Sequence, residues 1–462
     1  MKRNALVIGA NEEALFSIEE AHRAGLSVAA LDGNPKAKGL PAADAAYHVD
    51  INDLDAVYKL TDPLQPCVVV PGPIGHCLTT VGAVNDRYGL PGVSGEAAAL
   101  CTDKLQFHRV MAENGLRKAQ QVFLSEGQTV SEEDLLALTE YPVVVKPRYG
   151  SGSRGVEICG CLQELLCLLR YEIGEPVAAA SAASSDSGQT VGLHRENLEG
   201  QTVMSVMPED YVVETCVPGP EYGVDGAYVD GQFRMVLLRR KKNTPPPYRQ
   251  CVGYYSVLPE EDPVFYKNCC RMMQRMGETL GFKTCVVHAD IIQRRLSEEH
   301  LTGEPFVIET SARPSGHNLS NLFTPLASGV TIVEDFLKLS LGEPSDGLFR
   351  PKAVKKLLIR YFDLTPGKVV KVPDKEELLQ RFPLLSYECR IQEGDVLAPV
   401  TDGASVMGRG YYILEGESDT QLDLLDEQLR SLFVMQPGAA AGHDGIEPTA
   451  SSDFETDAED NR

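Results

Sequence analysis

The stretch Pro142-Val-Val-Val-Lys146-Pro-Arg-Tyr-Gly150-Ser-Gly-Ser-Arg-Gly155 decides how the middle of this chain is interpreted. Its apolar run predicts a strand, and a lysine leaves that strand directly into a turn rich in glycine and serine. Small residues let backbone N–H groups wrap an anion, so the lysine and the turn together favour a polyphosphate ligand. A P-loop differs, because its lysine follows the glycines. The structural alternative is a tight hairpin with an exposed lysine.

Two later strands, predicted at 284–292 and 305–310, carry further polar residues. Because side chains at i and i+2 share one face of a strand, pairing across a turn near Gly303 would bring two carboxylates and a guanidinium together. Mg²⁺ usually binds one or two carboxylates with nucleotide phosphates, and a nearby arginine stabilises charge in phosphoryl transfer. The alternative is an exposed ion pair on a hairpin. The residues concerned are His288 and Asp290, then Glu309, Ser311 and Arg313.

The N-terminal part predicts a doubly wound α/β domain. Short buried strands at 5–8, 28–31 and 67–70 and a helix over 12–24 indicate a parallel sheet wrapped by helices. A dinucleotide fingerprint needs three glycines, whereas only Gly9 is present and Glu12 and Glu13 would repel phosphate. A nicotinamide dehydrogenase is therefore only a third hypothesis.

The remaining chain predicts antiparallel strands, a long helix over 262–280 and an insertion at 174–202. Beyond Pro351, short strands and a helix from Ser418 to Leu432 suggest a small α+β domain. The acidic segment 437–462 is expected to be disordered.

Composition limits the classes of partner. The 462 residues carry a formal net charge of −23, which argues against general nucleic-acid binding but allows a local basic cleft for a phosphorylated small molecule. No run approaches the roughly 20 apolar residues that cross a bilayer, so no membrane partner is expected. The twelve cysteines contain no CxxC pair, which predicts reduced thiols in a cytoplasmic protein.

Two more motifs complete an ordered set. Leu90-Pro-Gly-Val-Ser-Gly95 precedes Thr102-Asp-Lys104, and Glu214-Thr-Cys-Val217-Pro-Gly219-Pro-Glu221 follows the glycine-rich turn. In this order the motifs resemble the ATP-grasp superfamily, specifically its carboxylate–amine ligases. The resemblance implies a two-lobed α+β ATP-grasp region at 96–345, between an N-terminal domain at 1–95 and a C-terminal domain at 351–435.

The resemblance also implies roles for individual residues, with ATP and Mg²⁺, or alternatively Mn²⁺, as cofactors. Lys104 and Lys146 would contact nucleotide phosphate, and Gly150, Ser151, Gly152, Ser153 and Gly155 would belong to a flap over it. Glu214 through Val217 would read the adenine, and Glu221 would hold the ribose. Asp290, Glu309 and Ser311 would bind the metal, with Arg313 and Lys146 catalytic. Asp290 and Ser311 depart from the family, which commonly has Glu and Asn there.

The implied reaction joins a small carboxylate, such as an amino acid, to an amine through an acylphosphate, with release of ADP and phosphate. The alternatives are an enzyme that phosphorylates bicarbonate and a protein that binds ATP without turnover. The basic segment Arg239–Arg249 predicts either a site for the substrate carboxylate or a basic turn on an acidic protein. Arg313 through Asn318 would close the other side of the pocket. A homodimer is compatible with these features.

Overall fold

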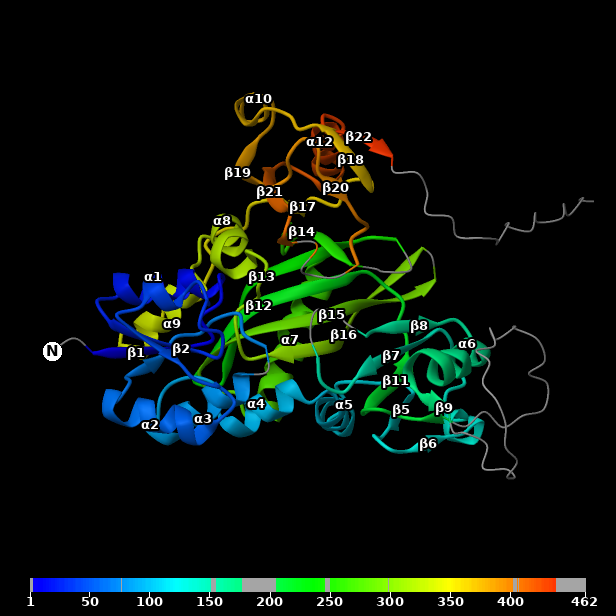
Figure 1. Ribbon diagram of the computed structural model, residues 1–462, viewed down its shortest axis with the longest axis horizontal. Coiled ribbons are helices and arrows are strands. Elements are labelled where there is room, and N and C mark those ends of the chain that lie inside the picture. Colours follow the sequence, from blue (N-terminus) through cyan, green and yellow to red (C-terminus); the bar gives the residue numbers. More distant parts are fainter. Residues whose placement is uncertain are drawn as a thin grey trace, which may run out of the picture.

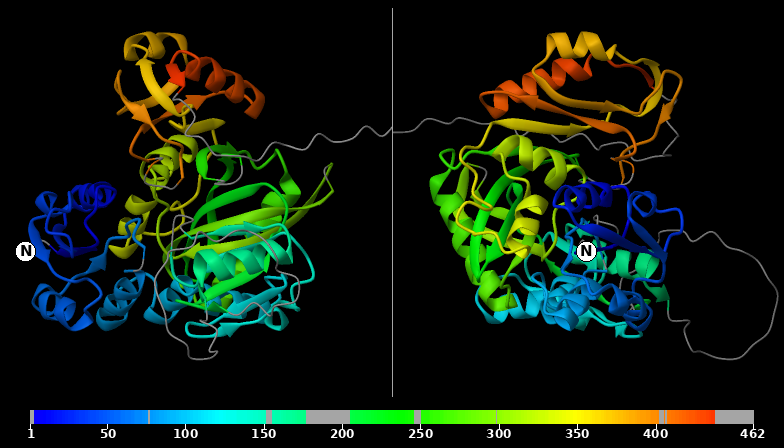
Figure 2. Two further views of the ribbon diagram at one scale, coloured as in Figure 1. Left: turned by 45° about the vertical axis from the view of Figure 1, so that its right-hand side comes forward. Right: turned by 90° about the vertical axis from the view of Figure 1, so that its left-hand side faces the viewer.

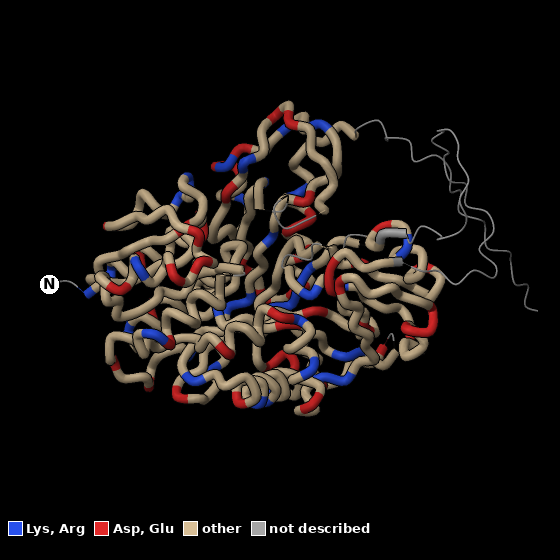
Figure 3. The backbone as a smooth tube through the Cα atoms, turned by 60° about the horizontal axis from the view of Figure 1, so that its bottom comes forward, with Lys and Arg blue, Asp and Glu red and all other residues tan. Residues whose placement is uncertain are grey.

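The computed structural model describes residues 3–75, 77–150, 155–176, 205–245, 250–297, 299–401, 405 and 407–437 (Figure 1). The flap predictions for Ser151, Gly152 and Ser153, most of the insertion predicted at 174–202 and nearly all of the tail lie outside these residues. Among the described residues, no helix has the length and apolar character needed to cross a membrane. Acidic and basic residues are interspersed along the described backbone (Figure 3).

The N-terminal domain is the predicted parallel sheet with helices on both faces. Its strand order is β3-β2-β1-β4, and one face packs on α1 and the other on α2 and α3. Alternate residues of β1 divide between the two cores, with Val7 in one and Leu6 in the other. The bounds are β1 Asn4–Ile8, α1 Ala14–Arg23, β2 Ser27–Asp32, β3 Ala45–His48, α2 Leu54–Leu64, β4 Val68–Val69 and α3 Leu78–Tyr88.

One helix from late in the chain returns to this domain. Helix α9 (Ile332–Ser340) packs against α1, and its Phe336 and Leu337 belong to the same core as Val7 (Figure 1). The short strand β3 was not predicted, because its residues Ala45–His48 alternate between half-buried and exposed and carry little apolar signal. The N-terminal domain is therefore attached to the rest of the molecule by packing as well as by the chain.

Helices α4 (Gly95–Thr102) and α5 (Lys104–Glu113) lead to a small lobe. Its antiparallel sheet has the order β5-β11-β7-β8 and packs on α6, and a three-stranded sheet β6-β10-β9 lies beside it. The bounds are β5 Gln121–Leu124, β6 Thr129–Val130, β7 Val143–Pro147, β8 Glu157–Cys159, α6 Leu162–Leu168, β9 Glu175–Pro176, β10 Ser205–Val206 and β11 Tyr211–Thr215.

The large lobe is built on an eight-stranded antiparallel sheet, β16-β15-β12-β13-β14-β17-β21-β19 (Figures 1 and 2). Its strands up to β16 are β12 Glu221–Val229, β13 Gln232–Asn243, β14 Cys251–Val257, β15 Cys285–Ser297 and β16 His300–Ser311. Helix α7 (Pro263–Leu280) contributes Met273 and Met276 to the core beneath this sheet. Its ends match the prediction, because Asp262 caps the first turn and Gly281 ends the helix in the left-handed conformation.

The C-terminal segment extends the same sheet. Strand β17 pairs with β14, so the strands of the large lobe and the C-terminal strands form one continuous sheet. A smaller sheet, β20-β18-β22, and helices α10 and α12 complete this part (Figure 2). The bounds are α8 Thr324–Ser328, β17 Leu357–Tyr361, β18 Gly367–Lys371, α10 Lys375–Arg381, β19 Leu384–Cys389, β20 Val396–Leu397, β21 Gly410–Glu415, α12 Asp419–Arg430 and β22 Val434–Pro437.

Candidate functional site

The two predicted carboxylate strands pair as expected. Asp290 on β15 is opposite Glu309 on β16, and His288 is opposite Ser311, so all four project from the same face of the sheet. The prediction of a turn near Gly303 was wrong. Strand β15 continues to Ser297 and β16 begins at His300, which places Gly303 inside a strand. The two strands are longer than the apolar residues alone predict. Their outer residues, such as Ser297 and His300, are exposed but still pair with each other.

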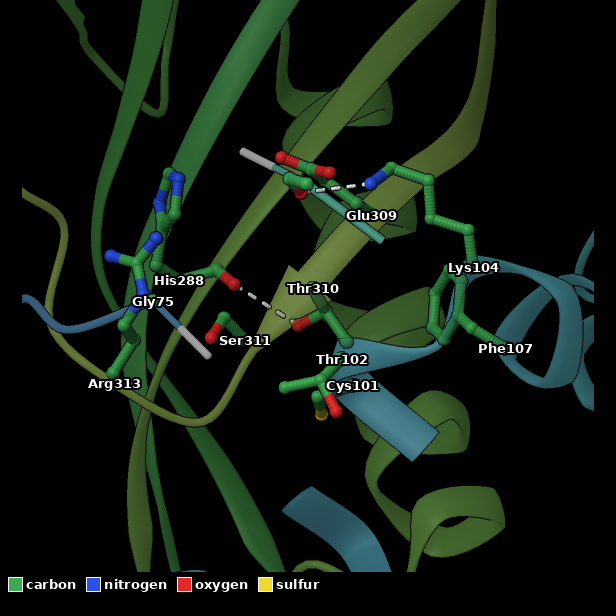
Figure 4. Close-up of a pocket in the computed structure, with 11 residues that line it drawn as sticks. Gly75, Cys101, Thr102, Lys104, Phe107, His288, Glu309, Thr310, Ser311 and Arg313 are labelled. Atoms are coloured by element: carbon green, nitrogen blue, oxygen red, sulfur yellow. Dashed lines mark hydrogen bonds between the residues drawn. The ribbon is translucent and has the colours of Figure 1, made fainter. Parts of the chain in front are cut away.

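A pocket forms where these strands meet the start of α5 (Figure 4). Lys104 and Glu309 lie toward one another on one side, while His288 and Arg313 lie on the other, with Ser311 between them. The pocket is also lined by Gly75, Cys101, Thr102, Phe107, Gly150 and Thr310. A single concavity thus combines cations, a carboxylate and a hydroxyl, which is the chemistry that a metal-bound polyphosphate requires.

Lys104 is positioned by the cap of its own helix. Asp103 accepts from the backbone of Gln106 at 3.1 Å and from Arg148 Nε at 2.9 Å, which ties the end of β7 to the start of α5. Lys104 Nζ donates to the carbonyl oxygen of Gly150 at 2.9 Å. Burial lowers the pKa of Lys104, although the nearby charge of Glu309 partly opposes this. The first predicted phosphate lysine is therefore held at the root of the predicted flap.

Lys146 lies at the end of β7 and is paired with Glu214 on the neighbouring strand β11, at 2.8 Å between Nζ and Oε1. Glu214 is only 2% exposed and also binds Arg117, while His108 Nδ1 lies 3.7 Å away. Burial alone would raise the pKa of Glu214, but the charges of Lys146 and Arg117 outweigh it and the pKa is lowered. The predicted adenine-reading residue is thus a buried counter-ion of the second phosphate lysine.

Neither His108 nor Arg117 was singled out from the sequence. Arg117 follows a helix in an ordinary polar loop, and its partner Glu214 lies 97 residues later, so no local signal marks it. His108 is buried in α5 and its pKa is lowered to about 3, by burial and by the charge of Arg117, so it is neutral near pH 7.

Asp290 has a counter-ion that the sequence analysis did not assign to it. Lys241 Nζ lies 2.7 Å from Asp290 Oδ2 and 3.6 Å from Glu221, the predicted ribose residue. Burial alone would raise the pKa of Asp290, but the charges of Lys241 and His288 lower it. The other oxygen, Oδ1, is buried without a hydrogen-bond partner among the described residues. A buried orphan oxygen of this kind fits a metal ligand.

Two carboxylates belong to the predicted metal site. The described residues contain no group of three or more His, Cys, Asp or Glu side chains placed to hold a metal ion. Glu309 forms no ion pair or hydrogen bond with the described part of the chain. With the orphan oxygen of Asp290, it offers two hard oxygen donors, which suits Mg²⁺ when phosphate oxygens complete the coordination.

The basic segment is a strand, and the prediction of a basic turn was wrong for residues 239–243. These residues belong to β13, so alternate side chains face opposite sides. Arg239 and Lys241 face the site, where Arg239 binds the buried Asp225 at 2.8 Å. Gly223 leaves room for this arginine, since a Cβ there would lie 3.1 Å from Nη2. Arg240 and Lys242 instead pair with Asp419 and Asp423 of α12.

The segment after β16 carries Arg313 and contacts the N-terminal domain. Arg313 Nη1 donates to the carbonyl oxygen of Pro314 at 2.9 Å, and burial lowers the pKa of this arginine. The backbone N–H of His317 donates to the Glu13 carboxylate, and a Cβ on Gly316 would lie only 2.9 Å from that carboxylate. Glu13, which argued against a dinucleotide site, therefore anchors the segment that positions Arg313.

The remaining predicted residues lie around the linker and the flap. Val217 lies between β11 and β12, in a linker where Gly219 approaches the carbonyl oxygen of Gln293 so closely that a Cβ would be 1.9 Å away. Gly155 adopts a positive φ of 67° beside Pro147. The structure does not place Lys146, Gly155, Glu214, Val217, Glu221 or Asp290 in the lining of the pocket of Figure 4; they lie on the strands and loops around it.

The chain is similar to known proteins over most of its length. No family model matches it. It is 24% identical over 394 residues to an L-arginine-specific L-amino acid ligase of Bacillus subtilis, covering 82% of this chain and 84% of that protein. Its fold is similar to an L-amino acid ligase from Bacillus licheniformis, with a TM-score of 0.69 and 18% identity over 95% of this chain and 99% of that one.

A third similarity concerns a complex with nucleotide. The biotin carboxylase domain of the Hydrogenobacter thermophilus 2-oxoglutarate carboxylase, solved as a dimer with MgADP, ADP and bicarbonate, has a TM-score of 0.60 and 15% identity. The alignment covers 94% of this chain and 91% of that chain.

Proposed function

From an ATP-grasp fold whose relatives and structural neighbours are carboxylate–amine ligases, we propose that this chain is an ATP-dependent ligase that joins a small carboxylate to an amine. The observation that carries the proposal is the cross-strand pair of Asp290 and Glu309, next to a pocket that also contains Lys104 and Arg313. Two carboxylates and two cations at one strand edge suit the binding of a metal-bound triphosphate.

The proposed reaction has two steps. A carboxylate oxygen of the substrate attacks the γ-phosphorus of ATP, the bond to the β–γ bridging oxygen breaks, and ADP leaves. The nitrogen of the amine then attacks the acyl carbon of the acylphosphate, inorganic phosphate leaves, and the amine loses a proton to give the amide. Each step needs positive charge around the transferring phosphoryl group and exclusion of water.

The residues divide these tasks by charge. Lys104 and Lys146 would hold the phosphates, and Asp290 and Glu309, with Ser311 beside them, would hold Mg²⁺ or Mn²⁺, which neutralises phosphate charge when bound. Arg313 would stabilise the transferring phosphoryl group and then the oxyanion of the second step. The predicted flap from Gly150 to Gly155 would keep water away from the acylphosphate.

Amino acids are the proposed substrates, because two of the similar proteins, one relative and one solved structure, are named as amino acid ligases. Arg239 and Lys241 are buried and already paired, so we assign the recognition of a substrate carboxylate to Arg313 instead. All twelve cysteines are free, which supports the proposed cytoplasmic location. The runner-up, phosphorylation of bicarbonate, is supported only by fold similarity to a biotin carboxylase.

The decisive experiment measures ADP and phosphate release from the full chain with Mg-ATP across single and paired amino acids, other small carboxylates and bicarbonate. Release that requires one acid and one amine would support the ligase. Turnover with bicarbonate alone would support the runner-up, and AMP in place of ADP would exclude the acylphosphate route. ATP binding without release across the panel would favour a non-catalytic binding protein.

Arg313 provides a direct test of this mechanism. We expect Arg313→Ala to lower kcat by about 10²-fold or more, because it removes charge stabilisation of the transition state. Arg313→Lys should retain part of the rate, since one positive charge remains. Arg390→Ala is the matched control, because Arg390 is exposed and pairs with Glu388. Near-normal ADP release from Arg313→Ala would contradict the role.

A further inference from the structure

A second pocket, here called the basic groove, lies between the end of α5, helix α7 and the β15–β16 hairpin. Its volume is about 380 Å³, which falls within the roughly 300–1,000 Å³ of small-molecule sites. No described residue lines both this groove and the catalytic pocket. The lining consists of Gly115, Leu116, Lys118, Asn268, Arg271, Met272, Arg275, Arg294, Glu304, Pro305 and Phe306.

The charge of the groove is opposite to that of the protein. Four cations, Lys118, Arg271, Arg275 and Arg294, face one acid, Glu304, in a chain with a net charge of −23. Near strands β15 and β16, by contrast, Lys241 is paired with Asp290. None of the four groove cations forms an ion pair with a carboxylate of the described residues. Their charge is therefore available to a ligand.

Two of the arginines are oriented by neutral partners. Arg275 Nη2 donates to the carbonyl oxygen of Asn114 at 2.9 Å, and Arg294 Nη2 donates to that of Lys118 at 2.7 Å. Arg294 also stacks over Phe306, with 5.1 Å between its Cζ and the ring centroid. A backbone carbonyl fixes a guanidinium without neutralising it, so the remaining N–H groups can bind a further acceptor.

We infer that the basic groove is a second ligand site that binds a small phosphorylated molecule, separately from the proposed ligase reaction. Arginine forks match the oxygen geometry of phosphate, and three arginines with a lysine can balance more than one negative charge. Phe306 and Met272 add an apolar floor for the organic part of the ligand. The dimensions of the groove and the acidic character of the rest of the surface exclude an extended nucleic acid.

The test is a calorimetric titration of the full chain with inorganic pyrophosphate, repeated with AMP and with inorganic phosphate. A non-hydrolysable ATP analogue is kept saturating, so that the catalytic pocket is occupied. We expect the double variant Lys118→Ala/Arg271→Ala to raise the Kd of pyrophosphate at least tenfold. Both residues are exposed, so their removal leaves the fold intact. Lys267→Ala is the matched control, since Lys267 is exposed on the same helix but does not line the groove.

The three ligands distinguish the source of the phosphate. Tighter binding of AMP than of pyrophosphate indicates a nucleotide, and the reverse indicates a free polyphosphate; both support the site when the double variant weakens them. Equal affinity in wild type, double variant and control would overturn the inference. Binding abolished by Lys104→Ala but not by the double variant would also overturn it, by placing the anion in the catalytic pocket. Failure of the ATP analogue to bind would count against the proposed function alone.

Discussion

At the scale of single residues, some charged side chains of the candidate site are already paired with each other and others are not. Lys241 neutralises Asp290, and Lys146 neutralises Glu214, while Glu309 has no partner among the described residues. A divalent cation that reaches Asp290 must therefore share it with a lysine that lies 2.7 Å away. This arrangement keeps a half-buried carboxylate ionised and available in the absence of a metal.

The Lys241–Asp290 pair gives a prediction about stability. Asp290 has a pKa lowered from its ordinary value of 3.8, so the pair stabilises the folded state above about pH 4 and loses this contribution as the pH falls further. We expect Lys241→Met to reduce the free energy of unfolding by about 3 kcal/mol at pH 7, because it leaves a half-buried carboxylate without its lysine counter-ion. The difference from wild type should shrink towards pH 3.

Denaturant unfolding across this pH range measures the effect. The control is Lys355→Met, because Lys355 forms an exposed pair with Glu415 that contributes about 0–1 kcal/mol. A wild-type-minus-variant difference that stays constant between pH 7 and pH 3 would show that Lys241 does not act through Asp290.

At the scale of elements, the linker between the two lobes depends on close backbone packing. Residues 216–220 join β11 to β12, and the carbonyl oxygens of Pro218 and Pro220 accept hydrogen bonds from the backbone N–H groups of Arg295 and Gln293 of β15. Gly219 lies between them with a φ of 145°, in a conformation that other residues rarely adopt. The linker between the two lobes is therefore held against the β15–β16 hairpin by backbone hydrogen bonds.

We expect Gly219→Ala to lower the free energy of unfolding by at least about 2 kcal/mol, because the new Cβ would lie 1.9 Å from the carbonyl oxygen of Gln293. The matched control is Gly231→Ala in the turn between β12 and β13. That glycine also has a positive φ, of 78°, but has open space around it, so the cost should be about 1 kcal/mol. Thermal melting compares the two, and equal losses would show that the backbone contact is unimportant.

At the scale of the whole molecule, the N-terminal domain is a component of the site. Glu13 at the start of α1 binds the backbone of His317, 304 residues later, and α9 packs into the N-terminal core. Figure 1 shows this domain beside the large sheet, and the C-terminal strands continue that sheet from β14 at the top of the view. The segment that carries Arg313 is thus fixed between two domains.

This contact predicts a catalytic effect of a residue remote from the phosphates. Glu13→Ala should lower kcat/KM at least about tenfold, because a charged hydrogen bond to the Arg313 segment is lost. Glu13→Gln should recover much of it, since an amide oxygen still accepts from His317. Glu12→Ala is the control, because the pairs of Glu12 with Lys38 and Arg390 lie at the exposed surface. Identical kinetics for all three variants would contradict a positioning role for Glu13.

Much of this arrangement could be predicted from local patterns. The strand before Lys146, the alternation of His288 with Asp290 and of Glu309 with Ser311, and the caps of α7 all depend on neighbouring residues, and the structure confirms them. The hairpin turn and the basic segment were misinterpreted, because exposed residues of a long strand carry the same polar signal as a loop. Periodicity alone does not separate these two cases.

By itself, the sequence determined the α/β class, the antiparallel character of the strands that carry the candidate site and the residue types at their ends, because these follow from spacing along the chain. Only the tertiary structure decided the pairs Lys241–Asp290, Arg117–Glu214 and Glu13–His317 and the four cations of the basic groove. Each of these joins residues from separate elements. Electrostatic interaction depends on the distance between charges in space, and that distance is set only when the strands pair in a defined register.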